Sequence, residues 1–89
     1  MIQTIASAAP RQRTKLRGQI VSVNGSETSS VRTDAVLSDG TGTLVLRFVG
    51  RRSIPGLDVG RSLVVEGTPT RVGGELVMLN PLYSFEGVA

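Results

Sequence analysis

The chain has 89 residues, 39% of them hydrophobic, and contains neither cysteine nor histidine. A chain of this length has room for one small hydrophobic core, and therefore for a single domain. The missing residue types remove disulfides, thiolate chemistry, and the commonest general base and metal ligand, so we expect a protein that is not an enzyme and binds no metal or cofactor.

The charge balance favours an anionic partner. Ten basic residues against seven acidic ones give a net charge of +3, and nine of the ten are arginine. Arginine binds phosphate through a planar fork of N–H donors and stacks on bases, so nucleic acid is the partner favoured most. The alternative is that +3 is an ordinary solubility charge on a small domain.

The opening of the chain gives no sign of export or membrane insertion. No apolar run approaches the roughly 18 residues that a spanning helix needs. The stretch MIQTIASAAP has no basic region before a short apolar part, unlike a signal peptide. We therefore expect a soluble, cytoplasmic protein without membrane contact, in which residues 1–12 form a flexible N-terminal arm.

Alternation of apolar and polar residues predicts strands rather than helices. The expected strands cover 15–23, 31–38, 43–49 and 62–70, followed by a hairpin over 71–80 that turns at Gly73-Gly74. Gly18 is a place where a strand bends or bulges, and the turn around Asp39-Gly40 predicts a tight hairpin. Pro69 indicates a bend or an edge, because proline has no N–H to donate.

The segment 50–60 is too short, and too broken by glycine and proline, for a long helix. We expect Ile54 and Leu57 to plug the core from this segment. Five short strands, a plug and bends at Gly18 and Gly67 favour a closed architecture, because an open sheet of this size leaves its edges exposed. The expected fold is all-β, a five-stranded Greek-key OB-fold barrel over residues 13–86 with 87–89 as a tail.

Three segments together resemble OB-fold nucleic-acid-binding domains of the anticodon-binding type. They are LRGQIVSV at 16–23, VLSDGTGTLVLRFVG at 36–50 and LDVGRSLVVEGTPTRVGGELVMLNPLYSF at 57–85. They are similar above all to the wedge domain of RecG-type branch-migration helicases, and GRRSIPGLDVG at 50–60 resembles small stand-alone actinobacterial OB-fold proteins. The resemblance covers roughly 14–86 and implies an OB fold that binds nucleic acid. It also leads us to expect an aromatic residue, often Trp, where this chain has Phe48.

In OB-folds the ligand lies across the second and third strands. Side-chain alternation turns Leu37 and Phe48 inward, and it turns Arg32 and Arg47 outward onto one shared face. The candidate nucleic-acid-binding residues are Arg17, Arg32, Arg47, Arg51, Arg52 and Arg71. We expect them to contact the phosphates of single-stranded or branched DNA. The alternative is a solvated face, on which Asp34 pairs with either outward arginine.

Few aromatic side chains are available to stack on bases. We expect Phe48 in the core and Tyr83 as a structural cap, so binding would be electrostatic, weak and sensitive to salt. The second hypothesis is a protein-interaction or homo-oligomerisation module with no nucleic-acid role, in which outward Val36 and Val45 form an apolar contact. Salt distinguishes the two hypotheses, because it weakens contacts between arginine and phosphate but does not weaken contacts between apolar side chains.

Overall fold

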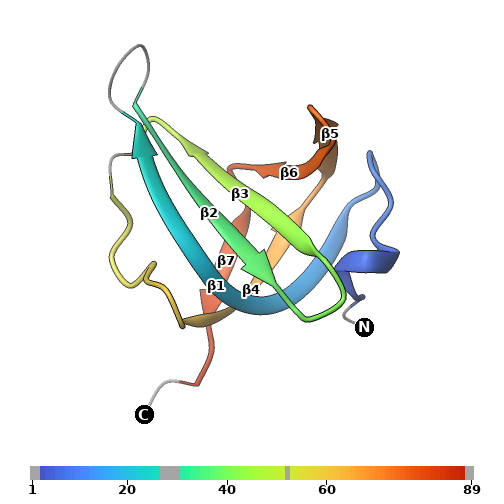
Figure 1. Ribbon diagram of the computed structural model, residues 1–89, viewed down its shortest axis with the longest axis horizontal. Helices are drawn as coiled ribbons and strands as arrows, with labels where there is room; N and C mark the ends of the chain where they lie inside the picture. Colours follow the sequence, from blue (N-terminus) through green and yellow to red (C-terminus); the bar gives the residue numbers. More distant parts are fainter. Residues whose placement is uncertain (1–2, 27–30, 52, 88–89) are drawn as a thin grey trace.

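The computed structural model describes residues 3–26, 31–51 and 53–87, and this part of the chain is almost entirely β-structure (Figure 1). Its elements are η1 (Ile5–Ser7, a 3-10 helix), β1 (Thr14–Ser26), β2 (Arg32–Ser38), β3 (Thr43–Val49), β4 (Ser62–Gly67), β5 (Pro69–Val72), β6 (Glu75–Leu79) and β7 (Leu82–Phe85). The expected all-β class is confirmed. Over these residues, no helix has the length and apolar character needed to cross a membrane.

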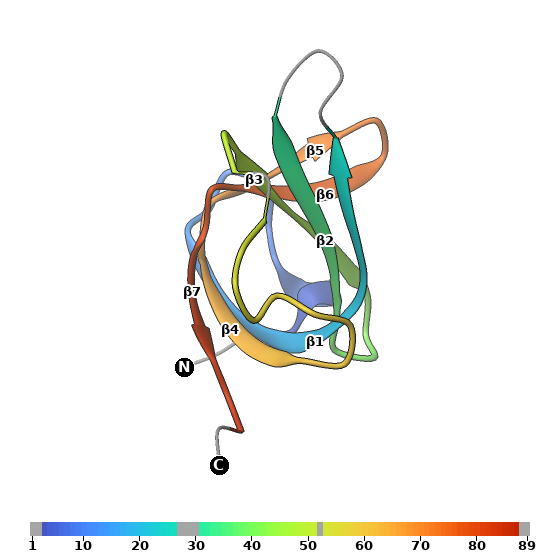
Figure 2. The same ribbon diagram turned by 90° about the vertical axis from the view of Figure 1, so that its left-hand side faces the viewer.

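The strands form a single mixed sheet in the order β5-β6-β3-β2-β1-β4-β7. β1, β2 and β3 are consecutive antiparallel neighbours, β4 returns to pair with β1, and β6 lies parallel to β3. Only Thr68 separates β4 from β5, although the two strands lie near opposite ends of this order. The sheet is therefore curled, so that β4 leads directly into β5 although five places separate them in the strand order (Figures 1 and 2).

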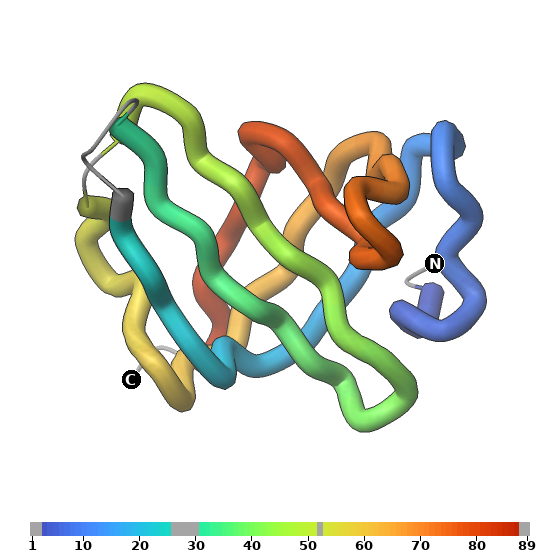
Figure 3. The backbone as a smooth tube through the Cα atoms, turned by 45° about the horizontal axis from the view of Figure 1, so that its top comes forward, coloured from blue at the N-terminus to red at the C-terminus, as the bar shows by residue number. Residues whose placement is uncertain are grey.

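β1 is long and strongly curved (Figures 1 and 3), because its two halves pair with different strands. Residues 14–19 pair with β4 and residues 19–26 with β2, with an irregular register between Ile20 and Ser22. A β-carbon built on Gly18 would lie 2.7 Å from the carbonyl oxygen of Ser38. Glycine is therefore needed where β1 changes partner, in agreement with the bend expected there.

The core lies on the concave side of the sheet. The fully buried side chains of β1, β2 and β3 include Leu16, Ile20, Leu37, Leu44 and Leu46. Ile54 and Leu57, from the segment between β3 and β4, are 6% and 4% exposed and join the same cluster, which confirms the expected plug.

Within the flexible arm expected over 1–12, the described residues 3–12 contact the rest of the domain. Ile5 of η1 is 4% exposed and belongs to the core cluster. Gln3 forms a parallel bridge with Leu16, so the segment also follows the start of β1. These contacts join residues that are far apart in the sequence, and for this reason local patterning did not predict them.

The strand count is seven rather than the five expected. The predicted strand over 62–70 is divided at Thr68 into β4 and β5, and the hairpin at Gly73-Gly74 joins β5 to β6 as expected. β7 follows the last expected strand and pairs with β4. Its Tyr83 packs against the core, with its ring centroid 5.5 Å from that of Phe48 in an edge-on arrangement.

Candidate nucleic-acid interface

The outer face of β2 and β3 carries the side chains selected from the sequence. The cross-strand pairs, in order along the strands, are Arg32–Val49, Asp34–Arg47, Val36–Val45 and Ser38–Thr43. Along β2, buried side chains alternate with partly exposed ones, and Arg32 and Asp34 are among the partly exposed. The expectation that Arg32 and Arg47 share one outward face is therefore confirmed.

Asp34 pairs with both arginines. Arg47 donates from Nε to Oδ1 at 3.1 Å and from Nη2 to Oδ2 at 3.2 Å, while Nε of Arg32 lies 3.7 Å from Oδ2. The side chains of Arg47 and Asp34 are 20% and 21% exposed, so their pair is partly shielded from water. The hydrogen bond with Asp34 raises the pKa of Arg47 above its ordinary value, so this guanidinium stays charged. The ion pair that the sequence left open is therefore present. Together the two arginines and Asp34 carry a net charge of +1.

β6 adds an apolar border to this face. The parallel register sets Val77 beside Val45 and Leu79 beside Arg47. Leu79 is 58% exposed, and Val49, the next outward residue after Arg47 on β3, is 50% exposed. We call the surface formed by Arg32, Asp34, Arg47, Val49 and Leu79 the cationic strip. Sequence reasoning missed Leu79 because only the long-range pairing of β3 with β6 brings it beside Arg47.

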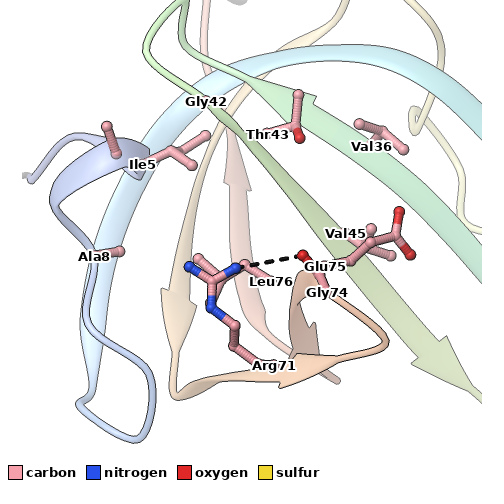
Figure 4. Close-up of a pocket in the computed structure, with 11 residues that line it drawn as sticks. Ile5, Ala8, Val36, Gly42, Thr43, Val45, Arg71, Gly74, Glu75 and Leu76 are labelled. Carbon is pink, nitrogen blue, oxygen red and sulfur yellow. Dashed lines mark hydrogen bonds between the residues drawn. The ribbon is translucent and has the colours of Figure 1, made fainter.

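At the other end of the face the surface becomes a pocket of about 270 Å³ (Figure 4). Its walls come from η1, the facing ends of β2 and β3, and the hairpin between β5 and β6. Val45 lines it and is only 7% exposed, so the open apolar contact expected at Val36 and Val45 is wrong for Val45. Alternation predicts the direction in which Val45 points, but the hairpin that shields it is distant in the sequence.

The remaining candidate arginines are dispersed. Arg71 belongs to the hairpin between β5 and β6 and lines the pocket. Arg17, on the half of β1 that pairs with β4, donates from Nε to Glu86 at 2.9 Å. Arg51 is exposed two residues after the end of β3, and Arg52 lies outside the described residues. The structure thus brings Arg32 and Arg47 together, sets Arg71 beside the neighbouring pocket, and leaves Arg17 on a different pair of strands.

Asp39 lies in the turn expected around Asp39-Gly40, and its carboxylate also binds the N-terminal segment. Its Oδ1 accepts hydrogen bonds from the backbone N–H of Thr41 at 2.9 Å and from the hydroxyl of Thr41 at 2.6 Å. Its Oδ2 accepts the backbone N–H of Ile5 at 2.9 Å. Burial alone would raise the pKa of Asp39, but these hydrogen bonds outweigh it and hold the pKa below its ordinary value.

The described side chains of the strip and the pocket are guanidinium, carboxylate, hydroxyl and aliphatic groups. In the described ranges, no group of three or more carboxylate, histidine or cysteine side chains gathers where it could hold a metal. No protein-family model matches the chain, and a search of curated proteins finds no match. The fold and the site together define an all-β domain that carries a cationic strip beside a pocket.

Proposed function

We propose that this chain is an OB-type barrel that binds single-stranded nucleic acid, with DNA the expected form, through the cationic strip. The barrel assignment is supported by the connectivity, in which three consecutive antiparallel strands are followed by a return to β1 and a parallel neighbour for β3. When β4 and β5 are counted as one bent strand, they complete the five strands together with β1, β2, β3 and β6. β7 is then an addition to the barrel.

The observation that carries the proposal is the environment of Arg47. A guanidinium has five N–H donors, and the pair with Asp34 uses two of those of Arg47. The other three remain for phosphate oxygens, while Asp34 fixes the plane of the guanidinium before any ligand arrives. Leu79 lies beside Arg47 on β6, Val49 is the next outward residue on β3, and both present aliphatic surface on which a base can pack.

The same features set limits on the affinity. Asp34 lowers the positive charge of the strip, and Phe48, which is 3% exposed, offers no face for base stacking. On this proposal, binding is weak and sensitive to salt. The chain then works as a cytoplasmic binding module without catalysis, cofactor or metal, in keeping with its lack of histidine and cysteine.

Fluorescence anisotropy with a labelled single strand of about 15–20 nucleotides, over a range of salt concentrations, tests the proposal. We expect binding at low salt, and a log–log salt slope that falls by about 0.7 in Arg32→Ala and in Arg47→Ala. Arg13→Ala is the charge-matched control, because Arg13 pairs with Glu66 of β4, which lies apart from the strip. No binding at low salt, or equal losses in all three variants, contradicts the proposal.

A protein-interaction or oligomerisation role is the second candidate, and the exposure of Leu79 and Val49 favours it. An apolar contact between two copies through these side chains should persist at high salt. Size-exclusion chromatography at low and high salt, with and without an oligonucleotide, separates the two roles. Self-association that survives high salt and ignores the oligonucleotide favours this second candidate.

A further inference from the structure

The pocket continues the cationic strip along β3. Val45, in the pocket wall, is the next outward residue before Arg47 on the same strand, so the two lie about 7 Å apart along the chain. The exposed fraction of the outward side chains on β3 falls from 50% at Val49 to 7% at Val45, which lines the pocket. A strand bound along the strip therefore meets this pocket as a recess at one end.

Two groups of opposite charge flank this recess. Arg71 and Glu75 both line the pocket, and Figure 4 shows their charged ends on opposite sides of the Gly74 carbonyl. Arg71 donates to that carbonyl from Nη1 at 3.4 Å, a long hydrogen bond that leaves its other donors available. The aliphatic part of the wall includes Val45 and Leu76, each 7% exposed. The site thus combines a donor fork, an aliphatic part of the wall and an acceptor pair.

We propose that this pocket takes one unstacked guanine base of a strand held on the cationic strip. This inference rests on the proposed function. Guanine presents two acceptors, O6 and N7, to which an arginine fork binds in pairs. On its Watson–Crick edge the same base carries N–H donors, which a carboxylate such as that of Glu75 accepts.

The other bases fit this pair of charges less well. Adenine has an amino donor beside N7, so it cannot accept both N–H groups of the Arg71 fork. Thymine lacks an amino group to donate to Glu75, and cytosine lacks the paired acceptors of the O6/N7 edge. A bare phosphate would meet Arg71 but would be repelled by the Glu75 carboxylate.

Competition between defined strands tests the inference. The probe is a strand of about 12 nucleotides, all thymidine except for one central guanine, compared with the all-thymidine strand. We expect about tenfold tighter binding of the guanine strand. Replacing that guanine by 7-deazaguanine removes the N7 acceptor, and replacing it by hypoxanthine removes the amino donor, so each change should lose most of the preference.

Pocket variants connect each loss to its residue. In Arg71→Ala the strand with 7-deazaguanine should bind as tightly as the guanine strand. In Glu75→Gln the strand with hypoxanthine should bind as tightly as the guanine strand. Arg13→Ala, outside the pocket, should keep the full preference. Equal binding of the guanine and all-thymidine strands, or a preference that survives both pocket variants, overturns this inference but leaves the proposed function standing. Failure of every strand to bind at low salt overturns both.

Discussion

Asp34 on β2 and Arg47 on β3 lie opposite each other across the two strands and are joined by two hydrogen bonds, of 3.1 and 3.2 Å. Nε of Arg32 is 3.7 Å from the same carboxylate. One acidic side chain thus partly neutralises the two cations on which the proposed function depends. Its removal should change binding and stability in opposite directions.

In Asp34→Asn we expect severalfold tighter binding of single-stranded DNA and a steeper salt dependence, because both guanidiniums lose their anionic partner. The free energy of unfolding should fall by about 1 kcal/mol, because a partly shielded bidentate pair is lost. Anisotropy and urea denaturation measure the two effects. Asp58→Asn, at an exposed position between β3 and β4, makes the same change in charge. It should change both the affinity for DNA and the free energy of unfolding by less than Asp34→Asn does. Weaker binding in Asp34→Asn would show that the carboxylate itself contributes to ligand binding.

Leu79→Ala should weaken binding of a single strand by about fivefold, because roughly 1 kcal/mol of apolar contact is lost. The salt slope should stay unchanged, since no charge is removed. Leu82→Ala is the matched control: Leu82 is 64% exposed but lies on β7, away from the strip. Equal behaviour of the two variants in anisotropy would exclude Leu79 from the interface.

Ile5→Ala should lower the free energy of unfolding by roughly 2–4 kcal/mol, because it leaves a cavity where a buried side chain contacts the core. Urea denaturation measures the change. Val59→Ala, at a side chain that is 66% exposed, should cost almost nothing and serves as the control. A negligible effect of Ile5→Ala would mean that the N-terminal segment does not contribute to the core in solution.

Asp39 should make the free energy of unfolding depend on pH in the acid range. The pKa of its carboxyl is lowered in the folded protein from the ordinary 3.8, so its contribution is complete above about pH 3.8 and is lost as the pH falls through the lower folded-state value. In Asp39→Asn the side chain has one acceptor oxygen instead of two, so the variant should have a lower free energy of unfolding at about pH 6. On acidification this free energy should fall less than that of the parent protein. Urea midpoints from about pH 6 down to about pH 2 test this. An acid profile identical to that of the parent protein would exclude Asp39 as the source.

Local patterning was sufficient for the elements whose partners are close in the sequence. The alternation in 31–38 and 43–49, with the turn at Asp39-Gly40 between them, predicted both strands, their hairpin and the face shared by Arg32 and Arg47. Ile54 and Leu57 were predicted as a plug because they are the large apolar residues of a segment rich in turn residues.

The features that the sequence did not predict depend on contacts between distant segments. Ile5 is buried in the core cluster where η1 meets the 39–42 turn, and Leu79 flanks Arg47 through the parallel pairing of β6 with β3. Val45 points outward as its parity requires, yet it is shielded by a hairpin that begins more than 20 residues later. In each case the side-chain direction follows from alternation, whereas its surroundings follow from topology.

The curvature of β1 has a consequence for the order in which the chain can fold. Residues 19–26 of β1 pair with β2, which follows directly, but residues 14–19 find their partner only in β4, at 62–67. During synthesis, the first half of this strand therefore has an unpaired edge, with Leu16 uncovered, until most of the domain has left the ribosome. Pairings this distant in sequence are slow to form, so folding should wait for the second half of the chain. The edge that β4 finally covers is then the stretch most open to mispairing with another nascent chain.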